Sequence, residues 1–366
     1  MTTNESAEMV DWDLAVATAR RLAKPGPAVT TEEARRVVED LKTFAAEASA
    51  PVRSFTGLRA EAAQAPVVVV DRGGWAQANA DGMREIITPL ADKLRARRSS
   101  SGLMDQVGPK VTGIETGALL AFLAAKVLGQ FDPFWSDASG SGAGAAGRLL
   151  LVAPNVVHVE RELEVDSRDF RMWVCLHEET HRVQFTAVPW LRDHLRSEIA
   201  SFIEATEVDP SVLLSRLRVI IKSVIESAQR GQDGPSVLEL MQSPEQKAII
   251  DRVTATMSLL EGHADVVMDG VGPEVVPSVA TIREKFQRRR AGANSLDRTV
   301  RRLLGIEAKM RQYRDGAKFV NTVVDQVGMS GFNRVWESTE TLPMLEEITD
   351  PVAWVRRVHG SSPPSP

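Results

Sequence analysis

Residues 170–185 form the stretch FRMWVCLHEETHRVQF, which contains the pattern H-E-x-x-H at positions 177–181. Residues four apart lie one above the other on the same face of an α-helix. His177 and His181 can therefore offer two imidazole nitrogens to one metal ion. No proline or glycine interrupts this stretch, so we predict a helix over residues 168–187.

Glu178 directly follows the first histidine of the pattern. In metallohydrolases the glutamate at this position takes a proton from a water molecule that the metal activates, which makes Glu178 the predicted catalytic base. Neighbours at helical spacing, all but one of them apolar, put both histidines on the face expected to meet the core. Those neighbours are Phe170, Trp173, Val174, Gln184 and Phe185. The alternative is two core histidines hydrogen-bonded to the backbone, with Glu178 on a solvated edge.

A catalytic zinc site needs a third protein ligand and leaves its fourth position for water. In one family of zinc peptidases a glycine follows the second histidine by three residues, and the third histidine ligand follows it by six. Here these positions hold Gln184 and Ala187. That class is excluded. The better candidate is Glu261, which shares a helix face with Asp265 four residues later. Asp265 would accept the ring N–H of a ligating histidine.

The apolar residues Met257, Ala264 and Met268 lie on or next to the face of Glu261 and Asp265, so we expect this face to be buried. Two carboxylates on an apolar face are costly unless a metal ion or a cation neutralises them. A metal ion is the favoured partner, and pairing with arginines is the alternative.

The residue that would stabilise a developing oxyanion is not selected by spacing. The candidates are Tyr313, the only tyrosine, and His263, with His158 and His194 as further possible donors. His263 lies about 200° around the helix from Glu261, so the two cannot serve one ion. We expect His263 to be a surface residue, with a role as acid or oxyanion donor as the alternative. Cys175, the only cysteine, is expected to be buried and inert, and it excludes an intrachain disulfide.

Composition indicates an ordinary globular protein. The chain has 366 residues, of which 43% are hydrophobic and 25% charged, with a formal net charge of −5. This charge argues against a general nucleic-acid binder. The first fifteen residues lack the features of a secretory signal, and the longest apolar run, residues 117–127, is too short for a bilayer. We predict a cytoplasmic protein without a membrane segment, of unspecified oligomeric state.

The hydrophobic patterns and the helix start and stop signals along the chain predict a mainly α-helical fold with a few short strands. Short β-branched or aliphatic runs predict strands over residues 65–71, 148–152 and 156–159. A strand close before an H-E-x-x-H helix is typical of zinc peptidases, where an edge strand binds extended substrate. The predicted helices cover residues 12–23, 30–48, 75–98, 110–130, 168–187, 191–207, 210–230 and 244–269, and most of 277–358.

The predicted division of the chain has three parts. Residues 1–105 form an N-terminal helical lobe, residues 106–358 form the catalytic region, and residues 359–366 form a disordered tail. The helices over 168–187 and 244–269 are expected to cross at the metal.

The pattern His177-Glu178-x-x-His181 with Glu261-x-x-x-Asp265 resembles the gluzincin motif of thermolysin-type peptidases. In that group the later glutamate binds zinc and the aspartate orients a histidine ligand. The whole chain is similar to a bacterial family of zincin-like hydrolases and zinc-dependent metalloproteases, some of them associated with biosynthesis of a deazaflavin coenzyme. The likeness is carried by VDWDLAVATARRLAKPGP, LGQFDPF, LLLVAPN, LHEETHRVQF, LEGHADVVMDGVG and PSVATIREKFQRRR.

This resemblance implies a zincin-like metallopeptidase core, zinc as cofactor, and a peptide or small amide as substrate. The chain lacks the aromatic and asparagine-rich edge-strand signature of thermolysin. One alternative is a zincin scaffold that binds a partner and does little chemistry. Another is hydrolysis of a non-peptide amide. The intact Glu178 favours an enzyme, because a purely structural site needs no base there.

Overall fold

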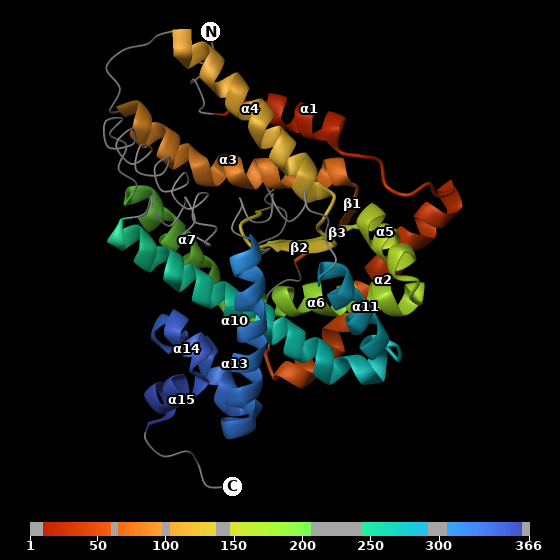
Figure 1. The fold of residues 1–366 in the computed structure, drawn as a ribbon, viewed down its shortest axis with the longest axis vertical. Coiled ribbons are helices and arrows are strands. Elements are labelled where there is room, and N and C mark those ends of the chain that lie inside the picture. Colours follow the sequence, from red (N-terminus) through yellow and green to blue (C-terminus); the bar gives the residue numbers. More distant parts are fainter. Residues whose placement is uncertain are drawn as a thin grey trace, which may run out of the picture. The chain divides into compact units, whose positions relative to one another are not determined.

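The computed structural model of the chain describes residues 10–59, 65–96, 103–136, 147–205, 243–291 and 306–360. The chain forms two compact units. Unit 1 comprises Met1–Val188 and Val267–Arg288, and unit 2 comprises Pro189–Val266 and Arg289–Pro366. Both are discontinuous in sequence because the long helix α10 (Pro244–Val275) belongs partly to each. As predicted, the fold is mainly α-helical with a small sheet (Figure 1).

Unit 1 combines helices with the sheet. Its strands are β1 (Val67–Val70), β2 (Gly129–Asp132) and β3 (Arg148–Val152). Besides the end of α10, its helices are α1 (Trp12–Leu22), α2 (Thr31–Thr56), α3 (Arg72–Ala96), α4 (Leu103–Ala124), α5 (Ala153–Leu163), α6 (Ser167–Ala187) and most of α11 (Val279–Ala291).

The sheet has the order β1-β3-β2, with β1 parallel and β2 antiparallel to the central β3. Successive side chains of a strand point to opposite faces. Leu150 and Val152 therefore join the core that α1, α3 and α4 build on one face of the sheet. Helix α6 contacts β2 and β3, and Figure 1 shows it on the opposite side of the sheet from α3 and α4. The sheet is thus a thin layer between two sets of helices.

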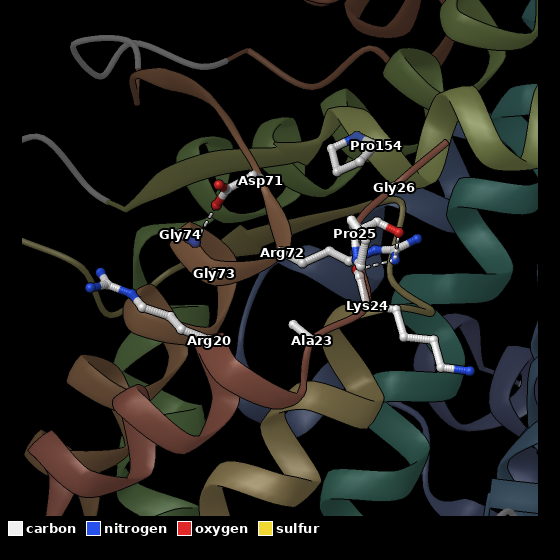
Figure 2. Close-up of a pocket in the computed structure, with 10 residues that line it drawn as sticks. All are labelled: Arg20, Ala23, Lys24, Pro25, Gly26, Asp71, Arg72, Gly73, Gly74 and Pro154. Atoms are coloured by element: carbon white, nitrogen blue, oxygen red, sulfur yellow. Dashed lines mark hydrogen bonds between the residues drawn. The ribbon is translucent and has the colours of Figure 1, made fainter. Parts of the chain in front are cut away.

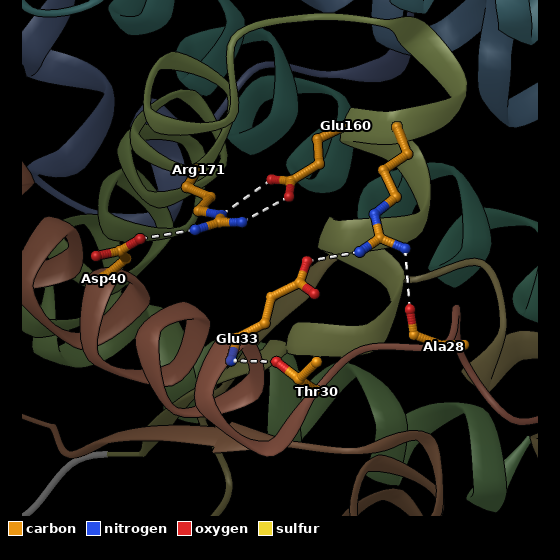
Figure 3. A network of polar contacts seen from close by, with 7 residues as sticks. Ala28, Thr30, Glu33, Asp40, Glu160 and Arg171 are labelled. Carbon is orange, nitrogen blue, oxygen red and sulfur yellow. Dashed lines mark hydrogen bonds and ion pairs between the residues drawn. The ribbon is translucent and has the colours of Figure 1, made fainter.

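Ion pairs connect α6 to its neighbours within unit 1 (Figure 3). The Arg171 guanidinium donates to both carboxylate oxygens of Glu160 on α5, at 2.9 and 2.6 Å, and to Asp40 on α2 at 2.6 Å. Arg171 and Glu160 are both buried, so removing either partner would leave an uncompensated charge. A second pair, Arg161 with Glu33, connects α5 to the first turn of α2. These pairs position α6 relative to α2 and α5.

Unit 2 is entirely helical in its described part. It contains α7 (Pro189–Glu204), the first part of α10, α13 (Ile306–Phe332), α14 (Leu345–Thr349), α15 (Pro351–His359) and the 3₁₀ turns η1 (Asn333–Trp336) and η2 (Thr339–Thr341). Helices α10 and α13 meet at two glycines. A Cβ atom on Gly262 would lie 2.1 Å from the backbone carbon of Gly316. This close crossing therefore requires glycine, which has no side chain, at both positions.

Most predicted elements are present, but several boundaries were wrong. The predicted strand over residues 156–159 is helical, because Pro154 favours a first helical turn and α5 buries Val156, Val157 and Val159. The helix predicted over residues 110–130 runs from Leu103 to Ala124, and β2 follows it. Helix α2 continues beyond Ala48 through Pro51 to Thr56, and α10 continues beyond Asp269 through two glycines to Val275.

Some predictions are not tested by the described residues. The helix over 210–230 and most of the predicted tail lie outside them. The division at residue 105 stays a prediction. Within the described ranges, no helix combines the length and the hydropathy that a bilayer crossing requires.

We predict that Gly262→Ala destabilises the protein by about 1–3 kcal/mol, because the added methyl group forces the backbones of α10 and α13 apart. Urea unfolding would measure the change. Gly82→Ala is the matched control, since Gly82 also lies in a helix but its added Cβ meets nothing within 4 Å. Equal unfolding midpoints for the two variants would contradict the tight crossing.

Candidate metal centre

Helix α6 is buried on nearly all sides. Between Phe170 and Thr186, His177 and His181 are the two residues that are not buried; each is half-buried. The five predicted neighbours are buried as expected, with Phe170 and Gln184 fully so. The prediction that the histidines share this core-facing stripe is met in part, since they lie on the same helix face as these neighbours but are half-buried. Both side chains therefore keep part of their surface exposed.

The two imidazoles are arranged to share one ion. Their Nε2 atoms are 3.2 Å apart, and the ring planes are nearly perpendicular at 89°. Two nitrogens bound to one tetrahedral zinc, each at about 2.0–2.1 Å, lie about 3.3 Å apart. The observed separation of the histidine nitrogens fits a single zinc ion.

The other ring nitrogen of each histidine faces an acceptor. The Nδ1 atom of His181 lies 2.9 Å from the Gln184 side-chain oxygen, and Nδ1 of His177 lies 3.2 Å from the Met268 sulfur. With Nδ1–H donating to these acceptors, both Nε2 atoms carry lone pairs directed at the same space. Two lone pairs at this separation repel each other, and a cation between them removes the repulsion. The donor chemistry of the pair therefore suits a metal ion.

Glu178 is buried, with 6% of its surface exposed, and its carboxyl group lies against the first residue of β2. A Cβ atom on Gly129 would lie 2.6 Å from the Glu178 carboxyl carbon and 2.8 Å from Oε1. Gly129 thus provides the space that the carboxylate occupies. Since Gly129 pairs with Leu151 of β3, the sheet holds this strand beside Glu178.

The next residue, Glu179, is fully buried and has a structural partner. Both of its carboxylate oxygens accept hydrogen bonds from Arg182, at 2.7 Å each. Another Arg182 nitrogen is 3.5 Å from the carbonyl oxygen of Ala65, just before β1. Glu178 and Glu179 therefore differ in surroundings, because Glu179 has its own arginine while Glu178 faces the glycine of the edge strand.

The end of α10 is fixed next to α6 within unit 1. Asp169, in the first turn of α6, accepts hydrogen bonds from the Ser278 backbone N–H at 2.9 Å and from its hydroxyl at 2.6 Å. Ser278 lies between α10 and α11. This contact is consistent with the Met268 side chain, 2% exposed, reaching the ring of His177.

Glu261 and Asp265 lie on α10 in unit 2, and both are half-buried. The expected burial of their face is only partly present: Ala264 and Met268 are buried, but Met257 is 37% exposed. The ligand role of Glu261 and the orienting role of Asp265 stay predictions.

The remaining predicted residues have mixed outcomes. His263 is fully buried, with its ring 5.3 Å from that of Phe332 and 5.5 Å from that of Trp336, so the expectation of a surface residue was wrong. A role for His263 as an oxyanion donor stays untested, and the side chain of Tyr313 lies outside the described part of α13. Cys175 is buried as expected. Burial raises the pKa of its thiol well above the usual range, and Glu178 and Glu179 act in the same direction.

A cavity of about 630 Å³ at the carboxyl ends of β1 and β3 is lined by none of the predicted site residues (Figure 2). Its polar groups already serve the fold. Asp71 accepts the backbone N–H of Gly74 at 2.6 Å at the start of α3. Arg72 donates to the backbone oxygens of Lys24 and Pro25 and to Asn155. These contacts connect the segment between α1 and α2 to the starts of α3 and α5.

A model of the zincin-like metallopeptidase family matches residues 10–355. The chain belongs to the zincin-like metallopeptidase family. A crystal structure described as "a putative hydrolase with a novel fold", from Chloroflexus aurantiacus, is 30% identical to it with a TM-score of 0.68. That match covers 96% of this chain and 100% of the other. No curated protein matches the sequence.

Membership in the zincin-like family supports a metallohydrolase in general terms and implies a bound metal, usually zinc.

Two residues next to the motif, Gln184 and Gly129, were not predicted as part of the site. Gln184 stands three residues after His181, a spacing that brings helix side chains together, and this was a usable signal. Gly129 carried no such signal, because its proximity to Glu178 depends on the packing of β2 against α6.

We predict that Gly129→Ala moves the Glu178 carboxyl group from its place and lowers stability by about 1–3 kcal/mol, since the new methyl group would overlap it. A crystal structure of the variant and its urea unfolding curve would measure both effects. An unchanged Glu178 position with wild-type stability would show that the contact is looser than described.

Proposed function

We propose that this member of the zincin-like family is a zinc-dependent metallopeptidase with Glu178 as its general base. The observation that carries the proposal is the arrangement of α6, where two imidazole Nε2 atoms lie 3.2 Å apart and the adjacent buried glutamate packs against an edge strand. If the two histidines served only core packing, they would not need to be partly accessible. Glu178 would also not need the space that Gly129 leaves for its carboxylate.

The proposed protein ligands are His177, His181 and Glu261. Two imidazoles and one carboxylate make a donor set that suits a catalytic zinc ion. Helix geometry supports Glu261. It precedes Met268 by seven residues on one continuous helix, close to two full turns, so both lie on the same face, and Met268 contacts His177. Asp265, four residues after Glu261, is the carboxylate to which the sequence prediction assigned the orienting role.

A zinc ion bound there would polarise the substrate carbonyl and lower the pKa of a water molecule towards neutrality. Glu178 then accepts the proton of the attacking water and delivers it to the leaving amine. Its 6% exposure removes competing solvent, and the contact with Gly129 limits the positions of its carboxylate. Tyr313 and His263 are the proposed oxyanion donors.

A peptide substrate is favoured by the position of β2. This strand is at the edge of the described sheet, and its first residue lies against Glu178. An extended peptide can add to such an edge through main-chain hydrogen bonds, which would bring its carbonyl groups near the base. Small amides are the alternative substrates. A scaffold without chemistry is disfavoured by the position of Glu178.

We predict that Glu178→Gln keeps one zinc ion per chain but lowers kcat by about 10²–10⁴-fold, because the amide cannot accept the proton. Metal analysis by mass spectrometry and assays on casein, short peptides and small amides would measure the two quantities. Wild-type turnover in the zinc-loaded variant would rule out the base role. If the zinc-loaded wild type hydrolyses none of these substrates, the scaffold interpretation gains support.

We predict that Glu261→Ala loses zinc or binds it far more weakly, because two histidines alone make an incomplete site. Zinc content after dialysis against a weak chelator would measure the loss. Glu274→Ala is the control, since Glu274 is an exposed carboxylate on the same helix. Equal zinc content in the two variants would mean that another residue provides the third ligand.

A further inference from the structure

The hydrogen bond from His181 to Gln184 joins a half-buried histidine to a buried side chain. Gln184 is fully buried, and its side-chain oxygen is 2.9 Å from Nδ1 of His181 on the preceding turn of the same helix. A carbonyl oxygen only accepts, so His181 must carry its proton on Nδ1 to make this bond. Its Nε2 atom is then deprotonated and available to a metal ion.

His177 has a different kind of neighbour at the same ring position. The Met268 sulfur lies 3.2 Å from Nδ1, and the Met268 side chain is 2% exposed. A thioether sulfur is a weak acceptor without a proton to donate. It therefore favours the same tautomer as Gln184 does, but by a weaker interaction.

We propose that Gln184 and Met268 are positioning residues of the metal centre, which hold His181 and His177 in the tautomer that directs both Nε2 lone pairs to one point. This inference rests on the proposed zinc site and deepens it. It assigns the orientation of the two histidines to two neutral side chains, in place of the carboxylate Asp265 that the sequence motif suggests, because a ring with Nε2 on the metal and Nδ1–H on Gln184 or Met268 has no further N–H to donate.

The two positioning residues act with unequal strength. An amide oxygen at 2.9 Å forms an ordinary hydrogen bond, whereas sulfur binds an N–H group weakly. Partners that orient a metal-binding histidine typically change metal affinity by 10–100-fold when they are removed. Loss of Gln184 should therefore weaken zinc binding more than loss of the Met268 sulfur does.

The test measures metal affinity and coordination, so it does not depend on turnover. The full chain is stripped with EDTA and titrated with Zn²⁺ in competition with a chromophoric chelator, and with Co²⁺ while its visible absorption is recorded. The variants are Gln184→Leu, which removes the acceptor, Gln184→Glu, which keeps an oxygen acceptor, and Met268→Leu, which removes the sulfur. Thr186→Val is the control, because Thr186 is also buried and polar on α6 but donates to the backbone oxygen of Arg182.

We expect Gln184→Leu to bind zinc 10–100-fold more weakly and to alter the cobalt spectrum, and Gln184→Glu to restore both. Met268→Leu should show a smaller loss, and Thr186→Val none. Urea unfolding of each metal-free variant identifies those that are folded. If Gln184→Leu does not fold, the comparison of Gln184→Glu and Met268→Leu with the wild type carries the test.

Wild-type zinc affinity and an unchanged cobalt spectrum in folded Gln184→Leu and Met268→Leu would overturn the inference and leave the zinc site standing. An equal loss in Thr186→Val would also overturn it, because the effect would then belong to packing of the helix. A wild-type chain that takes up no metal ion would contradict the proposed function itself, and the inference would fall with it.

Discussion

Two imidazole nitrogens held 3.2 Å apart on one turn of a buried helix are the constraint on which the site depends. Both nitrogens carry lone pairs if the opposite ring atoms donate to Gln184 and Met268, so their close approach is unfavourable until a cation joins them. Other charged side chains of α6 form ion pairs of their own. Glu179 pairs with Arg182, and Arg171 pairs with Glu160, so both acids are neutralised inside the protein.

The three-stranded sheet buries the aliphatic side chains of its central strand in the core and also fixes the position of one carboxylate. Strand β3 carries β2 on one edge, and β2 presents a residue without a side chain to Glu178. A larger residue at position 129 would compete for the volume of the proposed base. The helices α1, α3 and α4 on the far face of the sheet therefore act on the site indirectly, by setting where the edge strand lies.

Sequence patterns correctly predicted the helices and strands whose formation depends mainly on residues close together in the chain. The uninterrupted helical periodicity around His177 located α6 within one residue at its start, and aliphatic runs located β1 and β3. The valines at 156, 157 and 159 were misassigned because β-branched residues favour strands only when the neighbouring structure provides a sheet, and here a proline begins a helix. His263 was misplaced for a related reason. Its burial depends on aromatic partners 69 and 73 residues later in the chain, at Phe332 and Trp336, which the sequence around it does not indicate.

The single cysteine has a practical consequence for experiments on this protein. Cys175 is fully buried, with its sulfur 3.6 Å from the backbone oxygen of Leu41, and its raised pKa keeps it in the unreactive thiol form. A fluorophore or spin label can therefore be attached at one introduced surface cysteine without first removing the native one. Pairs of such labels, one in each unit, would report distances and motions of the native chain in solution.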